Sequence, residues 1–266
     1  MHRAFSTIGC PSANLEEVFE IAQRNNIEAV ELRALGDSVD LPTYFTRHFG
    51  RPSGLREFMQ SASVKITAIH TTSFRLMGPR EPDRDILRRY LPWADALGGV
   101  PLRVLDGGTK VTKAELRRAC SVLSWWREER EAEGAASDLI IETHHSLTNR
   151  AALERFMDVT SPDTALLWDA HQTWRNGGES PASLWPVLKE RVTHVHVRDS
   201  INEPGVGHPF TYVLPGDGEF PMAELTTELE RDGFAGTLCL DWELLWHSYL
   251  PPIDEALAEA KLKHWW

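Results

Sequence analysis

Cysteine is scarce in this chain, which has three among 266 residues: Cys10, Cys120 and Cys239. They lie far apart and form no Cys-x-x-Cys pair, so we expect reduced thiols in a cytoplasmic protein. No uninterrupted apolar run approaches about 18 residues, which predicts that no segment spans a membrane. Residues 1–5 do not contain the apolar core of a signal peptide.

Positively charged residues are also few. The chain has 28 Lys and Arg residues and 39 Asp and Glu residues, so its net charge is −11. An acidic surface repels phosphate backbones, so we do not expect nucleic acid as a partner. The chain also has no Gly-rich phosphate turn after its first strand, since residues 9–12 do not supply the spacing of a dinucleotide fingerprint.

Strand-like and helix-like stretches alternate along the whole chain. The expected strands are residues 5–9, 29–33, 64–70, 102–105, 139–142, 165–169, 192–197 and 237–242. The expected helices are near residues 15–22, 53–62, 83–97, 113–126, 149–159, 182–190, 221–232 and 253–260. This alternation predicts an α/β fold, a single (β/α)8 TIM barrel of eight parallel strands in one domain over residues 1–266. An open doubly wound sheet is the alternative, but such a sheet would be expected to have the Gly-rich phosphate turn after its first strand, which this chain does not have.

The longest loop, residues 200–220, follows the seventh strand and contains four of the glycines, at positions 205, 207, 216 and 218. Active-site loops of a barrel lie at the carboxyl ends of its strands. We therefore expect this loop to act as a lid over the site.

Acids and a histidine stand at or near the ends of four apolar runs. They are Glu142, Asp169, His196 and Asp241, with Glu243 just beyond. The first three are spaced by close to one βα unit, which takes roughly 30 residues. Successive parallel strands would bring all of them to one rim, which predicts a divalent-metal site. The alternative for each acid alone is an ion pair with a neighbouring arginine.

Residues two apart share a face of a strand, and this rule sorts the neighbours of these ligands. His194, His196 and Arg198 lie on one face. His196 is nearer the rim and is the expected ligand, whereas His194 is expected one layer deeper as a hydrogen-bonded residue. Arg198 would bind a substrate oxygen or pair with Asp169 or Asp199.

Further candidates follow from the same rule. His171 lies two residues beyond Asp169 and should point the same way, toward substrate or metal, and His70 ends the third strand. Asp241 and Glu243 share a face, so either could be the fourth ligand. Carboxylate ligands with one imidazole favour Mn²⁺ or Mg²⁺, with Co²⁺ and Zn²⁺ as alternatives.

The same segments carry a family resemblance. They are Ile-Glu-Thr-His at 141–144, Leu-Trp-Asp-Ala-His at 167–171, His-Val-His-Val-Arg-Asp at 194–199, Pro-Gly-Asp-Gly-Glu at 215–219 and the strand at 236–243. The chain resembles the xylose isomerase-like TIM-barrel superfamily, the sugar phosphate isomerase/epimerase group, over nearly its whole length. That group includes ketose 3-epimerases, hydroxypyruvate isomerases, inosose dehydratases and, more remotely, endonuclease IV.

The resemblance implies a ligand set. Glu142, Asp169 and His196 would hold the metal, and the fourth ligand of the family is a Glu five residues after a glycine that opens the eighth strand. Counting from Gly236 reaches Asp241, so this chain has Asp where the family usually has Glu.

The resemblance also implies an acid–base pair, the first and last carboxylates of the ligand set, here Glu142 and Asp241. Asp241 is one methylene shorter than the usual Glu, and Glu243 is the residue that could compensate. A second departure is Gln172, which stands where relatives commonly have a histidine that contacts substrate.

Together these expectations predict a divalent-metal-dependent isomerase or epimerase of a ketose or related hydroxycarbonyl sugar, which transfers a proton through a metal-stabilised enediolate. His171, Arg198, His70 and Gln172 would contact the substrate. The alternatives are a dehydratase of a cyclic polyol ketone, a non-catalytic metal-binding or sugar-binding protein or partner subunit, and an endonuclease IV-like repair enzyme, which the net charge disfavours. By resemblance we also expect a homodimer or homotetramer.

Overall fold

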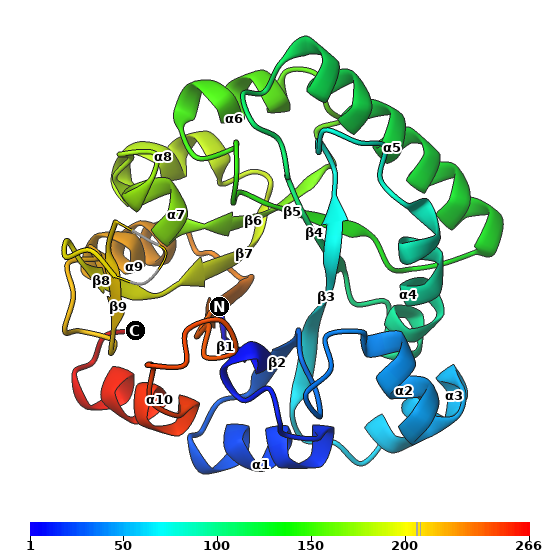
Figure 1. Cartoon of the computed structure of the whole chain (residues 1–266), viewed down its shortest axis with the longest axis horizontal. Helices are drawn as coiled ribbons and strands as arrows, with labels where there is room; N and C mark the ends of the chain where they lie inside the picture. Colours follow the sequence, from blue (N-terminus) through cyan, green and yellow to red (C-terminus); the bar gives the residue numbers. More distant parts are fainter. Residues whose placement is uncertain (206, 208) are drawn as a thin grey trace.

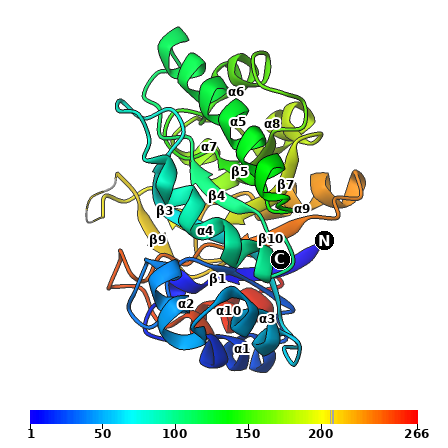
Figure 2. The ribbon, with the colours of Figure 1, turned by 90° about the vertical axis from the view of Figure 1, so that its right-hand side faces the viewer.

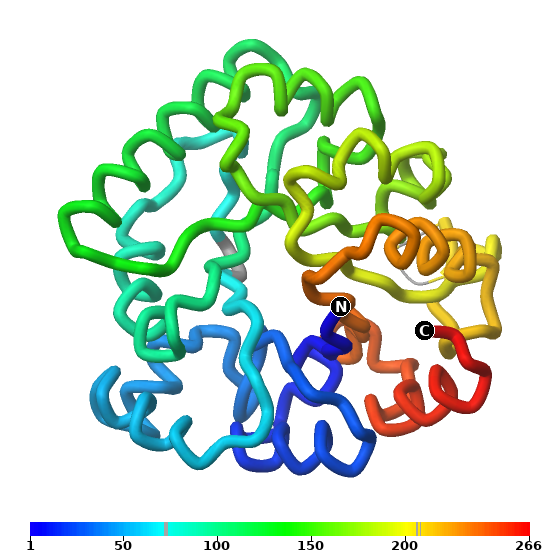
Figure 3. Tube along the Cα trace, turned by 180° about the vertical axis from the view of Figure 1, so that it is seen from behind, coloured from blue at the N-terminus to red at the C-terminus, as the bar shows by residue number. Residues whose placement is uncertain are grey.

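The computed structural model describes residues 1–205, 207 and 209–266, and the side chains at positions 72 and 73 lie outside that description. Eight parallel strands close into a barrel in the order β1-β10-β7-β6-β5-β4-β3-β2. Helices form a ring around these strands (Figure 1), and the view from behind shows the same ring (Figure 3). The predicted (β/α)8 barrel is confirmed.

The barrel strands alternate with helices along the chain, as the sequence predicts, but the expected first strand at residues 5–9 is misplaced: β1 ends at Ser6, and Thr7–Gly9 form a 3-10 helix. The strands are β1 (His2–Ser6), β2 (Ala29–Leu32), β3 (Lys65–Arg75), β4 (Leu102–Leu105), β5 (Leu139–Glu142), β6 (Ala165–Asp169), β7 (Val192–Val197) and β10 (Thr237–Leu240). The helices are α1 (Leu15–Arg24), α2 (Leu41–Phe49), α3 (Pro52–Met59), α4 (Arg84–Ala96), α5 (Lys113–Glu133), α6 (Arg150–Met157), α7 (Ala170–Arg175), α8 (Pro181–Leu188), α9 (Met222–Arg231) and α10 (Ile253–Leu262).

Capping boxes fix where two of these helices begin. The side chain of Asn14 accepts the N–H of Glu17, whose carboxylate accepts the N–H of Asn14 in return, at the start of α1. Thr112 and Glu115 form the same pair at the start of α5, as the sequence predicts. At the other end of α5, Gly134 adopts the left-handed conformation (φ 64°) that commonly ends a helix.

Three elements extend beyond the sequence-based expectations. Helix α2 begins at an N-cap, Asp40, whose side chain accepts the N–H of Thr43, and the short α7 directly follows β6. The long loop after β7 contains an antiparallel hairpin, β8 (Asp199–Ile201) and β9 (Thr211–Val213). Figure 2 shows this hairpin at the end of the barrel opposite to the N-terminus. Positions 206 and 208 of the expected lid lie outside the described residues.

The strands are buried on both faces, since every residue of β2, β4, β5 and β10 is buried. Their apolar side chains pack under the surrounding helices and inside the barrel, so charged side chains inside need partners. All three cysteines are free. In the part of the chain that is described, no helix combines the length and apolarity needed to cross a membrane.

Candidate metal centre

Four side chains from four strand ends meet at one mouth of the barrel. Glu142 and Asp169 are the last residues of β5 and β6, His196 lies in β7, and Asp241 directly follows β10. One candidate ligand atom from each lies within 4.8 Å of all the others, and none of these residues is more than 1% exposed. The structure therefore brings together the four residues expected to hold a metal.

Carboxylate oxygens and one ring nitrogen of this cluster converge as metal ligands do. Oε2 of Glu142 pairs with Arg103, whereas Oε1 of Glu142 and Nδ1 of His196 have no hydrogen-bond partner among the described residues. That Nδ1 lies 3.4 Å from Oε1 of Glu142 and 3.6 Å from Oδ2 of Asp241. A shared cation would satisfy these buried atoms together. Three carboxylates and one imidazole suit Mn²⁺, Mg²⁺ or Zn²⁺, so the residues fit a divalent metal ion.

Arg198 stands between two of the candidate ligands. Its Nη1 donates to Oδ2 of Asp241 over 2.8 Å, and its Nη2 pairs with Asp169. The same Nη1 lies 3.2 Å from Oε2 of Glu243. Of the two acids that the sequence suggested as partners of Arg198, the structure shows Asp169. The carboxylate of Asp199 instead accepts backbone N–H groups of the loop at residues 200–220, which contains the hairpin and is called the hairpin segment below.

Two further buried arginines belong to the cluster, and the sequence analysis missed both. Arg33, directly after β2, lies 3.1 Å from Asp241, and Arg103 in β4 pairs with Glu142. The five buried carboxylates of the network are Glu31, Glu142, Asp169, Asp241 and Glu243. Five carboxylates against three guanidinium groups leave two negative charges. Burial opposes the charge of His196, but Glu31 and Asp241 raise its pKa well above the usual range, so its imidazolium offsets one of these charges while no metal is bound. A divalent cation that displaced this proton would cancel both.

Burial and ion pairing set the charge of these acids. Burial opposes ionisation of Asp241 and Glu243, but the guanidinium groups of Arg33 and Arg198 hold both pKa values below their usual range. Burial raises the pKa of Asp169 despite its pairing with Arg198. Asp241 and Glu243 are therefore ionised at neutral pH.

The two candidates for the fourth ligand occupy different places. Asp241 lies in the ligand group with Glu142, Asp169 and His196. Glu243 lies outside that group, with Oε1 3.3 Å from Arg33 and the ion pair to Arg198 described above. The geometry thus favours Asp241 as ligand and Glu243 as a partner of the arginines.

His70 and His196 share one carboxylate deeper in the barrel. Oε2 of Glu31 lies 2.8 Å from Nε2 of His70 and 2.7 Å from Nε2 of His196, and all three residues are fully buried. Burial and the charge of Arg103 lower the pKa of His70 to about 3, so its imidazole is neutral. Among the described residues, His70 makes its hydrogen bond through Nε2, to the carboxylate that also contacts the candidate ligand His196. Nε2 of His194, one layer deeper as expected, lies 3.0 Å from the carbonyl oxygen of Thr67.

The two polar residues after Asp169 take different positions. His171 Nε2 lies 2.8 Å from Oγ of Ser200, and its ring contacts Phe210 and Tyr212 of the hairpin segment. Gln172 uses its backbone N–H to donate to Oδ1 of Asp169 over 2.9 Å, which holds that carboxylate at the start of α7. Substrate contact by either side chain stays a prediction.

Hydrogen bonds to Asp199 hold the hairpin segment beside the mouth of the barrel. Oδ2 of Asp199 accepts the N–H of Gly216 and of Gly218, over 2.9 and 3.0 Å. The ring of Tyr212 lies 5.5 Å from the guanidinium carbon of Arg198, a cation–π contact. The segment therefore covers the arginine that binds the candidate ligands, which is the position that a lid requires.

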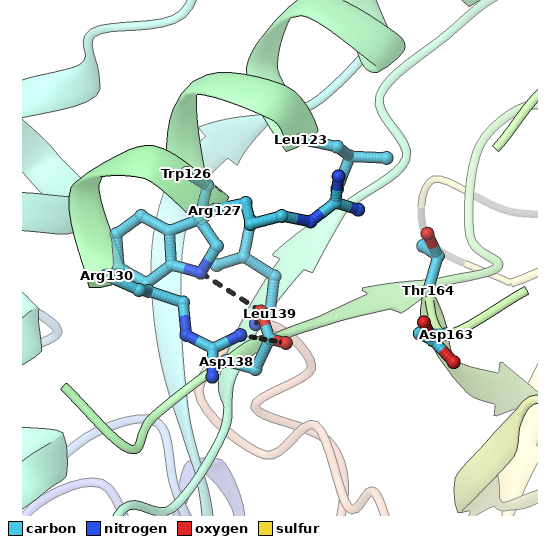
Figure 4. Close-up of a pocket in the computed structure, with 8 residues that line it drawn as sticks. All are labelled: Leu123, Trp126, Arg127, Arg130, Asp138, Leu139, Asp163 and Thr164. Atoms are coloured by element: carbon cyan, nitrogen blue, oxygen red, sulfur yellow. Dashed lines mark hydrogen bonds and ion pairs between the residues drawn. The ribbon is translucent and has the colours of Figure 1, made fainter. Parts of the chain in front are cut away.

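A cavity of about 200 Å³ lies at the other end of the barrel, where β5 and β6 begin (Figure 4). In it Asp138 accepts a hydrogen bond from Nε1 of Trp126 over 3.1 Å and pairs with Arg130. The lining residues are Leu123, Trp126, Arg127, Arg130, Asp138, Leu139, Asp163 and Thr164. Because barrel chemistry belongs to the carboxyl ends of the strands, we assign no function to this cavity.

The family of this chain follows from its similarity to known proteins. Residues 19–264 match the sequence profile of the xylose isomerase-like TIM barrel. The chain belongs to this family. Among curated members, it is 21% identical to an inosose dehydratase of Lacticaseibacillus casei, over 72% of this chain and 74% of that protein.

Solved structures show the same family fold. The probable 3-DHS dehydratase AsbF of Bacillus anthracis, involved in petrobactin synthesis, superposes with a TM-score of 0.77 at 15% identity, over 99% of both chains. The IOLI protein, solved with a zinc atom, superposes with a TM-score of 0.75 at 18% identity, over 98% of this chain and 96% of that one.

Proposed function

We propose that this protein is a divalent-metal-dependent dehydratase, which removes water from a cyclic polyol ketone. The observation that carries the proposal is the convergence of Glu142, Asp169, His196 and Asp241 at the carboxyl-end mouth of the barrel, where Oε1 of Glu142 and Nδ1 of His196 have no hydrogen-bond partner among the described residues. The choice of dehydration over the isomerisation or epimerisation expected from the sequence is supported by relatives that are named as dehydratases. The zinc atom of a third relative supports a divalent cation.

Glu142 is the proposed base. It takes the proton from the carbon beside the ketone, and the electron pair of that C–H bond forms the new carbon–carbon double bond. The hydroxyl on the next carbon leaves with that proton, so the products are one unsaturated ketone and one water. A bound divalent cation supplies the positive charge that stabilises the ketone oxygen as it becomes negative.

The charge of Asp241 supports elimination over epimerisation. An epimerase needs a second group that returns a proton to the opposite face of the carbon. Asp241 is the residue expected for that step, but its carboxylate pairs with the guanidinium groups of both Arg33 and Arg198, which favour its ionised form over a protonated form that could donate. Elimination needs no second donor, because Glu142 can pass the same proton to the departing hydroxyl. Asp241 is then a metal ligand, and Glu243 orients Arg198.

A product assay by mass tests this proposal. Metal-loaded protein is incubated with cyclic polyol ketones in heavy water, and the products are analysed by mass spectrometry. The proposal predicts a product lighter by one water. A product of unchanged formula that has gained deuterium would overturn dehydration in favour of an isomerase or epimerase. Neither product, from protein with bound metal, would contradict an enzymatic role on these substrates.

A further inference from the structure

We propose that Glu31 is a positioning residue that fixes which nitrogen of His196 binds the metal ion. The inference rests on the metal centre of the proposed function, and it assigns a role to a buried acid outside the candidate ligand set. Glu31 lies in β2, whereas His196 lies in β7, and β1 and β10 separate these strands in the barrel. Its side chain therefore reaches across the barrel interior.

The two ring nitrogens of His196 face different groups. Nε2 lies 2.7 Å from Oε2 of Glu31, while Nδ1 faces Glu142 and Asp241 without a hydrogen bond from the described residues. A histidine that binds a metal ion is neutral, and its ring carries one N–H and one lone pair. An ionised carboxylate only accepts, so the proton lies on Nε2 and the lone pair on Nδ1. Glu31 thus directs the lone pair of His196 toward the other ligands.

The surroundings of Glu31 suit this role. Ala29 shares its face of β2, and Ala68 is its register partner in β3, so small side chains leave room for the carboxylate to extend inward. The second contact to the same Oε2, from Nε2 of His70 over 2.8 Å, holds the side chain in place. Carboxylates that accept the second N–H of a metal-bound histidine are common, and they fix the tautomer and orientation of the ring.

A second cation site is the alternative for this part of the barrel, because ligand atoms of Glu31, His70 and His196 also lie within 4.8 Å of one another. Their spacing argues for hydrogen bonds instead. Two ligands each about 2.1 Å from one tetrahedral ion lie roughly 3.4 Å apart. The N–O separations of 2.7 and 2.8 Å are shorter than this and match N–H···O hydrogen bonds.

Cobalt titration tests the inference without relying on turnover. Metal-free wild-type protein, Glu31→Gln and Glu31→Leu are titrated with Co²⁺ and followed by visible absorption, with thermal unfolding in chelator as the check on folding. Glu31→Leu should bind Co²⁺ about 10- to 100-fold more weakly at unchanged stoichiometry. Glu31→Gln should fall between, because its amide oxygen still accepts the proton from His196.

The matched control is His194→Gln, which removes another buried imidazole of β7 whose partner is the Thr67 carbonyl. It should retain the wild-type affinity. Wild-type affinity in folded Glu31→Leu, or an equal loss in His194→Gln, would overturn the role of Glu31. Failure of the wild-type protein itself to bind Co²⁺ would instead overturn the metal centre, and with it the proposed function.

Discussion

Nη1 of Arg198 donates to Oδ2 of Asp241 over 2.8 Å inside a mouth where both residues are almost fully buried. The same guanidinium pairs with Asp169, so one arginine contacts two candidate metal ligands. Together with Arg33 it keeps Asp241 ionised although that residue is buried. A bound cation would share these carboxylates with the arginine, which would link stability to metal binding.

Replacing Arg198 with Met should therefore destabilise the metal-free protein by about 3–5 kcal/mol, because Asp169 and Asp241 lose a buried cationic partner. Saturating Mn²⁺ should recover part of this loss by supplying charge to the same carboxylates. Urea unfolding in chelator and in Mn²⁺ measures both quantities. An equal loss under the two conditions would show that the cation does not act on these acids. Arg88→Met, which breaks the surface pair with Glu129, is the control and should change stability far less than Arg198→Met under both conditions.

Metal addition should raise the melting temperature of the wild-type protein. A ligand at 100 times its dissociation constant stabilises the native state by about 2.7 kcal/mol, which for a chain of this size corresponds to roughly 5–10 °C. Differential scanning fluorimetry with and without Mn²⁺ measures the shift. Asp169→Ala removes one ligand and should lose most of it. A shift of the same size in Asp169→Ala would place the stabilising ion elsewhere.

Glu142→Gln should lower turnover by about 10²- to 10⁴-fold, since Gln cannot take a proton from carbon. Gln keeps the shape of Glu but loses the ion pair with Arg103, so circular dichroism must first show that the variant is folded. Rates of water loss from a ketone that the wild-type protein converts give the comparison. Glu57→Gln, at an exposed position in α3, is the matched control and should keep full activity. Normal turnover in Glu142→Gln would rule out Glu142 as the base.

Asp106 gives a prediction about pH. This buried carboxylate accepts the N–H groups of His145, Ser146 and Leu147, over 2.8, 2.6 and 2.7 Å, and so shapes the loop after Glu142. Burial opposes its charge, but these bonds and the His145 ring lower its pKa from 3.8 to about 2.

Because the folded pKa is the lower one, the carboxylate contributes stability above about pH 3.8 that is lost as the pH falls toward 2. Asp106→Asn should lose about 1.5–3 kcal/mol at pH 7, since an amide NH₂ group would then face backbone N–H groups. Its stability should also fall less between pH 4 and pH 2 than that of the wild-type protein. Urea unfolding at several pH values checks this, and parallel curves for the two proteins would contradict it.

The sequence predicts the barrel well, because its signals are local. The apolar runs that end in Glu142 and Asp169 coincide with β5 and β6, and Thr112 with Glu115 begins a helix as their spacing predicts. The hairpin β8–β9 escaped prediction because each strand has only three residues, too few to show a pattern. Its strands pair across the loop, with Asp199 opposite Val213.

The sequence predicts the candidate ligands, because they stand at the ends of strands. It does not predict the arginines that pair with them. Arg33 meets Asp241 across 208 positions of sequence, and no periodicity encodes such a pair. One signal was available for Arg103: it is a charged residue inside the short apolar strand Leu102–Leu105, and a cation buried there requires an acid. Glu31 offered the same signal in β2, yet its two histidine partners become visible only when the barrel closes.

Anomalous diffraction from crystals of the Mn²⁺-loaded protein tests the central claim most directly. We predict one strong peak within about 2.0–2.4 Å of a carboxylate oxygen from each of Glu142, Asp169 and Asp241 and of Nδ1 of His196. A peak held by other residues, or no peak at this mouth at saturating Mn²⁺, would contradict the account.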